Sequence, residues 1–145
     1  MIYSVPRLWN AMRALEVLNG NSGWNEGAEG LFTPEAVVAL LLDAPSRRIV
    51  MSTIQSGKMV EEIRAETGIP LSTCYRKVAE LVKENVLVAE RMVMTTAGKK
   101  YAIYRSAIAG VRIDVRKGAM DVSVLPNPEV AGRLQMAMLA KQFEH

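Results

Sequence analysis

The sequence predicts an α+β protein in which short helices are followed by two β-hairpins. Apolar residues recur at helical spacing as far as residue 84, a strand-like alternation follows, and two glycine-containing turns interrupt that alternation. The chain has 145 residues, of which 50% are hydrophobic and 23% are charged. This composition is typical of a globular protein with a packed core, and the length predicts one domain with appendages.

Helices are predicted in five segments before residue 85. They cover about 4–18, 34–42, 46–56, 59–66 and 71–84. The segment 20–30, GNSGWNEGAEG, is predicted to be a linker because it is rich in glycine and asparagine. Asp43 or Ser46 can cap the third helix, and Asn85, which tolerates a left-handed backbone, can end the fifth.

Two hairpins and a last helix are predicted after residue 85. VLVAERMVM (86–94) is expected to pair with KYAIYRSAI (100–108), and VRIDV with MDVSV across Lys117-Gly118. Asn127-Pro128-Glu129 is typical of a helix start, so a helix is expected from there to about Gln142.

The last helix carries apolar residues around most of its circumference, which predicts that it is covered on more than one side. A second copy of the chain would provide that cover, with dimer contacts from Val130, Leu134 and Met138. Packing against the chain's own N-terminal helix is the alternative.

The helix expected over 71–84 has one apolar and one polar face. Its apolar face is predicted to hold Leu71, Cys74, Val78, Leu81 and Val82. A helix that reads DNA presents its N-terminal residues to base edges in the major groove. There Arg can donate two hydrogen bonds to guanine, and Ser or Thr can bond either a donor or an acceptor on a base. The predicted base-reading residues are Ser72, Thr73, Tyr75 and Arg76. The alternative is that these residues only form a solvated helix face beside the apolar face that packs into the core.

Three short helices followed by a hairpin form the layout of a winged helix-turn-helix. Thr67-Gly68-Ile69-Pro70 provides a tight turn of the right length, with Ile69 available to hold the turn to the core. The hairpin region is basic, with seven Lys or Arg and one acid from residue 91 to residue 117. Lys99 and Lys100 sit beside Gly98, at the tip where a wing would lie along the phosphates. The predicted phosphate contacts are Lys77, Lys99, Lys100, Arg91, Arg47 and Lys58. The alternative is that these basic residues only keep the edge strands of the hairpins soluble.

LLDAPSRRIV (41–50) and EEIRAETGIPLSTCYRKVAELVKENVLV (61–88) resemble the prokaryotic winged helix-turn-helix regulators of the ArsR type and their archaeal relatives. The family's Asp-Pro-Arg-Arg opening, Gly-hydrophobic turn and Ser-Thr recognition helix are matched by Asp43, Pro45, Arg47, Arg48, Gly68, Ile69, Ser72 and Thr73, with one residue inserted after Asp43. The resemblance covers residues 40–106 and implies a dimeric transcriptional regulator.

The chain departs from the metal-sensing members of that family, which carry cysteine pairs or His/Asp clusters. One cysteine, Cys74, and one histidine, His145, cannot complete a zinc site within one chain. We therefore expect no metal and no other cofactor, and any effector is unknown. Cys74 shares the face of Val78 and is expected to fill the core, and a thiol switch near Arg76 is the alternative.

No catalytic residues are predicted, because no nucleophile–base pair or phosphate-binding loop occurs in the sequence. No apolar run reaches the length of about 18 residues that spans a membrane, so no membrane-spanning helix is expected. The single cysteine fits the expected cytoplasmic location.

We therefore expect a homodimer that binds double-stranded DNA and regulates transcription. Residues 1–30 would form the N-terminal helix and linker, 31–106 the DNA-binding domain, and 107–145 the second hairpin and dimerisation helix. An architectural chromatin protein with little sequence preference and a winged helix that docks proteins are the alternatives.

Overall fold

The structure is a computed structural model, and it describes residues 32–130. Helices come first and strands follow, in the order α2 (Pro34–Leu42), α3 (Ala44–Thr53), α4 (Val60–Thr67), α5 (Leu71–Lys83), β1 (Leu87–Met94), β2 (Lys100–Ser106), β3 (Ile108–Arg116) and β4 (Ala119–Pro126). The predicted α+β class is confirmed. The helix expected over 4–18, the linker at 20–30 and the last helix beyond residue 130 lie outside the described residues.

Asp43 separates the first two described helices. It accepts hydrogen bonds from the Ser46 amide at 3.1 Å and from the Ser46 hydroxyl at 2.7 Å, which makes it the cap of α3. The α3 helix ends at Thr53, earlier than the predicted end near Ser56. The carbonyls of Ile54 and Gln55, which a longer helix would bond internally, accept instead from the side chains of Arg105 and Asn127.

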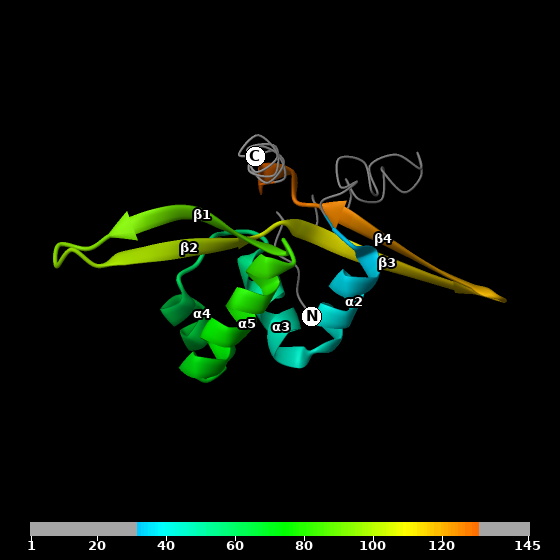
Figure 1. Ribbon diagram of the computed structural model, residues 1–145, viewed down its shortest axis with the longest axis horizontal. Coiled ribbons are helices and arrows are strands. Elements are labelled where there is room, and N and C mark those ends of the chain that lie inside the picture. The colour runs from blue at the N-terminus through cyan, green and yellow to red at the C-terminus, as the bar shows by residue number, and fades with distance from the viewer. Residues whose placement is uncertain (1–31, 131–145) are drawn as a thin grey trace, which may run out of the picture.

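The four strands form two separate antiparallel hairpins, β1 with β2 and β3 with β4. Figure 1 shows that the hairpins extend in opposite directions from the group of helices. Ala107 joins them: its amide donates to the Val86 carbonyl and its carbonyl accepts from the Asn127 amide, both at 2.8 Å. These two bonds tie the point where the hairpins diverge to the start of the first hairpin and the end of the second.

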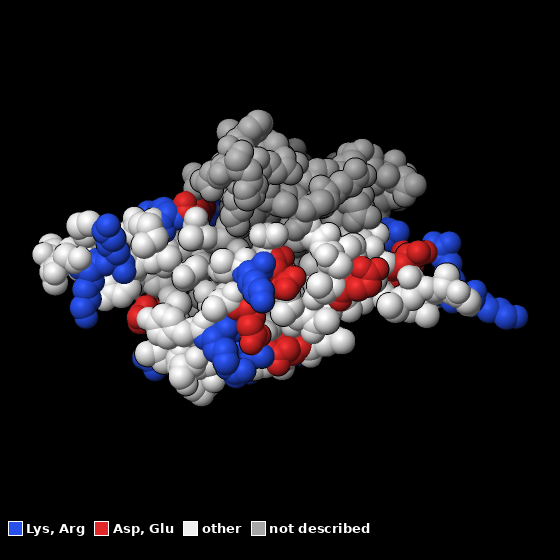
Figure 2. All heavy atoms as spheres, in the orientation of Figure 1, with Lys and Arg blue, Asp and Glu red and all other residues white. Residues whose placement is uncertain are grey.

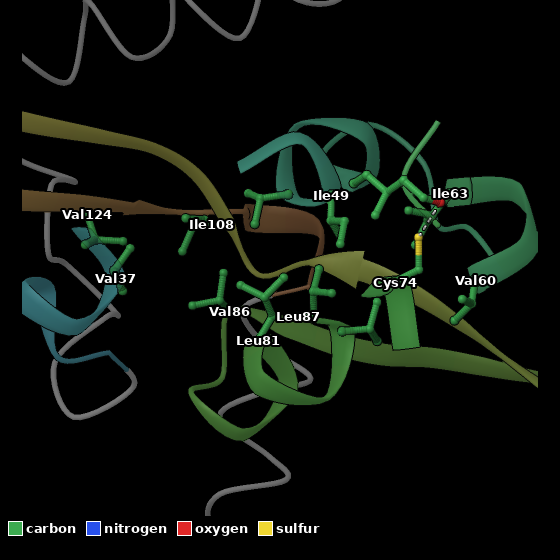
Figure 3. Close-up of a cluster of buried hydrophobic side chains, with 13 residues drawn as sticks. Val37, Ile49, Val60, Ile63, Cys74, Leu81, Val86, Leu87, Ile108 and Val124 are labelled. Atoms are coloured by element: carbon green, nitrogen blue, oxygen red, sulfur yellow. Dashed lines mark hydrogen bonds between the residues drawn. The ribbon is translucent and has the colours of Figure 1, made fainter. Parts of the chain in front are cut away.

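One hydrophobic core is shared by the helices and both hairpins (Figure 3). Its fully buried members include Val37, Ile49, Ile63, Cys74, Leu81, Leu87, Ile108 and Val124. The segments predicted as separate units, 31–106 and 107–145, thus both contribute to it, through Leu87 from β1 and Ile108 from β3.

Two members of the apolar stripe predicted on α5 lie outside this core. Cys74, Val78 and Leu81 are buried as predicted, whereas Leu71 and Val82 are each more than a third exposed. At about 100° per residue, Leu71 and Val82 lie roughly 60° and 80° from Cys74 on the helical wheel. They therefore flank the buried stripe.

Candidate nucleic-acid interface

The turn between α4 and α5 determines where α5 begins. Gly68 adopts a left-handed backbone with φ of 74°, and its amide donates to the Arg64 carbonyl at 2.8 Å to close α4. The Thr67 hydroxyl accepts from the Ile69 amide at 3.3 Å, and the Ile69 side chain is buried, as predicted. Arg48 of α3 donates to the Thr67 carbonyl at 3.2 Å. The turn is thus bonded both to the helix that precedes it and to α3.

Burial of Cys74 orients the exposed side chains of α5. The thiol is fully buried and donates to the Ile69 carbonyl at 3.5 Å, as the dashed line in Figure 3 shows. Burial raises the pKa of this thiol. On the other side of the helix, Ser72 and Arg76 are exposed and Thr73 is partly exposed. Two hydroxyls and one guanidinium therefore share the outward face of the first two turns of α5.

Tyr75, the fourth predicted base-reading residue, is half exposed and already has a partner. Its hydroxyl donates to Oε1 of Glu61 in α4 at 3.0 Å. This hydrogen bond to a carboxylate raises the pKa of Tyr75, because ionising the phenol would lose the bond. The tyrosine ring is held toward α4, and the hydroxyl oxygen keeps a lone pair with which it can accept a further bond.

Two of the predicted phosphate contacts are engaged within the protein. Lys77 Nζ lies 3.1 Å from Asp43 and 3.6 Å from Glu80, and its side chain is 15% exposed. Lys58 Nζ pairs with Glu66 and donates to the Ser52 carbonyl, and its side chain is 18% exposed. Neither ammonium group projects freely from the surface, so we remove both from the predicted phosphate contacts.

The other four predicted phosphate contacts are exposed. Arg47 donates from Nη1 to the Leu41 carbonyl at 2.9 Å and is otherwise open to solvent. Arg91 lies on β1, and Lys99 and Lys100 lie at the end of the first hairpin. There the chain turns through Gly98, whose φ is 82°, and the Thr95 amide donates to the Lys99 carbonyl at 2.8 Å.

The basic residues counted together in the sequence divide into three groups in space. Arg91, Lys99 and Lys100 belong to the first hairpin, whereas Arg112, Arg116 and Lys117 belong to the second hairpin, which extends the other way. Figure 2 accordingly shows Lys and Arg at both outer ends of the molecule. Arg105 is buried. Of the seven cations between residues 91 and 117, only Arg91, Lys99 and Lys100 are therefore exposed on the first hairpin, the predicted wing.

Sequence reasoning missed the structural role of Arg105. Its guanidinium donates to the carbonyls of Ile54 and Gln55 and pairs with Glu90 at 3.3 Å and with Glu129. Asn127 donates to the same Ile54 carbonyl at 3.0 Å. No local signal marks this residue, because a basic residue in an alternating strand is usually exposed.

The dimer contacts predicted in the last helix are only partly within the described residues. Val130 is fully buried with Ala107, and Phe32 and Val88 pack against the pair. Its side chain lies inside the chain's own fold, which corrects its assignment as a dimer contact. Leu134 and Met138 lie outside the described residues.

Between residues 32 and 130 no three His, Cys, Asp or Glu side chains are grouped so that they could hold a metal ion. None of the helices in that range is both long enough and apolar enough to cross a membrane. Comparison of the chain with models of protein families, with curated proteins and with solved structures found no match.

Proposed function

We propose that this protein is a DNA-binding transcriptional regulator in which α3, α4, α5 and the first hairpin act as a winged helix-turn-helix. The observation that carries the proposal is the composition of the outward face of α5 at its N-terminal end. Ser72, Thr73 and Arg76 lie together there, opposite the buried Cys74. Hydroxyls and a guanidinium are the groups that read base edges in the major groove.

The first hairpin would supply phosphate contacts beside α5. Arg91, Lys99 and Lys100 are exposed on it, and the helices α4 and α5 lie beneath the same hairpin (Figure 1). Exposed cations next to a base-reading helix add salt-dependent affinity and position the helix without reading the sequence. Arg47 completes the proposed set of phosphate contacts.

The proposed regulator acts as a homodimer. Two copies related by a two-fold axis would present two α5 helices to a palindromic site. The resemblance to ArsR-type regulators implies the same arrangement.

Exposed methionines on the first hairpin favour protein docking as a second candidate function. Met92 and Met94 are both mostly exposed on β1. Methionine adapts to varied apolar partners and is common at binding surfaces. A protein-docking module would show no affinity for DNA at moderate salt.

Selection of bound sequences from random DNA duplexes, followed by a salt titration, tests the proposal. A regulator should enrich a palindromic sequence and bind it about 10³-fold or more tightly than random duplex. Equal affinity for selected and random duplex would instead indicate an architectural chromatin protein. Absence of binding to either would overturn the proposal in favour of docking.

A further inference from the structure

The second hairpin is an arm whose β3 edge is open among the described residues, 32–130. Its strand β3 pairs with β4, with a register shift between Ile108 and Gly110, and no other strand within residues 32–130 pairs with β3. β3 is 9 residues long and contains no proline and no lysine. Proline, charged side chains, bulges or a covering element commonly protect such an edge, because an open edge pairs with other strands. On β3 the register shift lies only at the base, between Ile108 and Gly110, and the charged residues are Arg112, Asp114 and Arg116.

The arm also has one apolar face that continues outward from the core. On this face three cross-strand pairs follow one another: Val111 with Val124, Ile113 with Val122, and Val115 with Met120. Val124 is buried in the shared core, whereas Val115 is 75% and Met120 60% exposed. A two-stranded hairpin is marginally stable alone, and exposed apolar surface of this kind marks an interaction site.

The opposite face of the arm places two carboxylates directly across from each other. Asp114 lies directly across from Asp121 on β4, and like charges in that position are destabilising. Arg112, two residues before Asp114 on β3, donates from Nε to the Asp114 carboxylate at 2.9 Å. Arg112, Asp114 and Arg116 thus alternate in sign along this face of β3.

The charges on β3 select one way in which two copies of the strand can pair. In a β3–β3 pair related by a two-fold axis, one residue lies directly opposite the same residue of the other copy. The axis passes between these two equivalent residues. An axis at Arg112 or at Asp114 would oppose like charges. An axis at Ile113 places Arg112 opposite the partner's Asp114, twice, and Val111 opposite Val115. An axis at Val115 opposes Asp114 and Arg116 but overlaps only the last few residues of each strand.

We propose that two copies of this chain pair through the open edges of β3, antiparallel and centred on Ile113, to form one four-stranded sheet. Each Asp114 then lies between Asp121 of its own hairpin and Arg112 of the other copy, so that it gains a cation directly opposite it. The exposed end of each arm lies beside the base of the other arm, so that Val115 gains Val111 of the other copy as an apolar neighbour on the side away from Met120. The pairing would supply the dimer of the proposed function, and it does not depend on contact with DNA.

Sedimentation velocity of the full chain without DNA, over a range of concentrations, tests the pairing. Wild type should dimerise, and Arg112→Asp and Asp114→Arg should each weaken the dimer about tenfold or more, because each places like charges opposite one another twice. A mixture of the two variants should recover the dimer, because position 112 of one copy and position 114 of the other then carry opposite charges at both crossings. Circular dichroism should show that both variants keep the wild-type fold.

Arg116→Asp is the matched control. It changes the net charge as Arg112→Asp does, yet in this register residue 116 faces Gly110 of the other copy, so the dimer should keep its wild-type affinity. Three outcomes overturn the pairing: a wild-type monomer, variants that dimerise as wild type does, or a mixture no tighter than its components. DNA binding measured separately on the same variants distinguishes this failure from failure of the proposed function.

Discussion

The guanidinium of Arg105 in β2 bonds the main-chain carbonyl of Ile54, the residue that follows α3, with Nε at 3.3 Å and Nη2 at 3.2 Å. The same guanidinium pairs with Glu90 in β1 and with Glu129, which follows the second hairpin. One buried arginine therefore joins the end of a helix, the first hairpin and the segment that leaves the second hairpin.

Replacing Arg105 with alanine should lower the free energy of unfolding by about 3 kcal/mol. The substitution leaves the Ile54 carbonyl with fewer donors and Glu90 without this cation inside the protein. Urea denaturation measures the change. Arg91→Ala, on the exposed part of the same hairpin, is the control and should stay within about 0.5 kcal/mol of wild type. Equal effects of the two substitutions would contradict the structural role of Arg105.

Two glycines should respond differently to alanine. A Cβ at Gly57 would lie 2.5 Å from Oε2 of Glu90 and 2.5 Å from Cγ2 of Ile103, whereas no atom lies within 4 Å of a Cβ at Gly68. Gly57→Ala should therefore cost about 2 kcal/mol through overpacking. Gly68→Ala should cost about 1 kcal/mol, because its φ of 74° disfavours a side chain. Thermal unfolding of both variants tests this order, and the reverse order would show that the packing around Gly57 relaxes freely.

Arg76 and Lys99 should affect DNA binding in different ways. Arg76→Ala should weaken binding to the selected sequence by about 1–3 kcal/mol and leave binding to random duplex nearly unchanged, because a base contact is lost. Lys99→Ala should weaken both equally and reduce the salt slope by about 0.9, because one phosphate contact is lost. Fluorescence anisotropy at several salt concentrations separates the two patterns. Lys77→Ala, whose ammonium pairs with Asp43, should leave the salt slope unchanged.

Acid should weaken the fold partly through Asp43. Hydrogen bonds from the Ser46 hydroxyl and amide, together with Lys77, lower the pKa of Asp43 from 3.8 to about 2. A carboxyl with a lowered pKa stabilises the fold above its unfolded pKa, and this contribution is lost as the pH falls through the folded pKa. The difference in unfolding free energy between wild type and Asp43→Ala should therefore shrink as the pH falls from about 4 to 2. A difference that stays constant across that range would contradict the assignment.

Cys74 should be inert in the folded protein. Its thiol is fully buried and its pKa is raised by that burial, so the reactive thiolate is scarce and inaccessible. A thiol reagent should label Cys74 only at the rate at which the protein unfolds. Mild peroxide should change DNA binding equally little in wild type and in Cys74→Ser. A loss of binding confined to wild type would support the thiol switch instead.

The order of helices and hairpins within residues 32–130 could be predicted from the sequence because its signals are local. The Asp43 cap, the left-handed Gly68 and the change of period after residue 85 each act within a few residues. For the same reason the inward direction of Cys74 and the outward direction of Ser72 and Arg76 follow from helical spacing alone.

Which charged side chains are exposed and which are paired within the protein could not be predicted in this way. The fold brings Asp43 to 3.1 Å from Lys77, although α3 and α4 separate the two residues along the chain. This ion pair decides whether Lys77 is available to a phosphate. Arg105 likewise finds its partners at the end of α3 and beyond β4. Pairing of distant charges depends on tertiary geometry, to which the spacing of residues along the chain gives no guide.

By itself, the sequence determined that Cys74, Val78 and Leu81 face the core and that Ser72 and Arg76 face outward, because a helix repeats every 3.6 residues whatever surrounds it. Only the tertiary structure decided which cations remain exposed, and that the two hairpins extend in opposite directions. The hairpins diverge at Ala107 because its amide and carbonyl are bonded to Val86 and Asn127, which lie far from each other along the chain. Long-range hydrogen bonds and ion pairs thus determine which charged side chains are exposed and where the hairpins lie, which the short-range periodicity of the sequence does not.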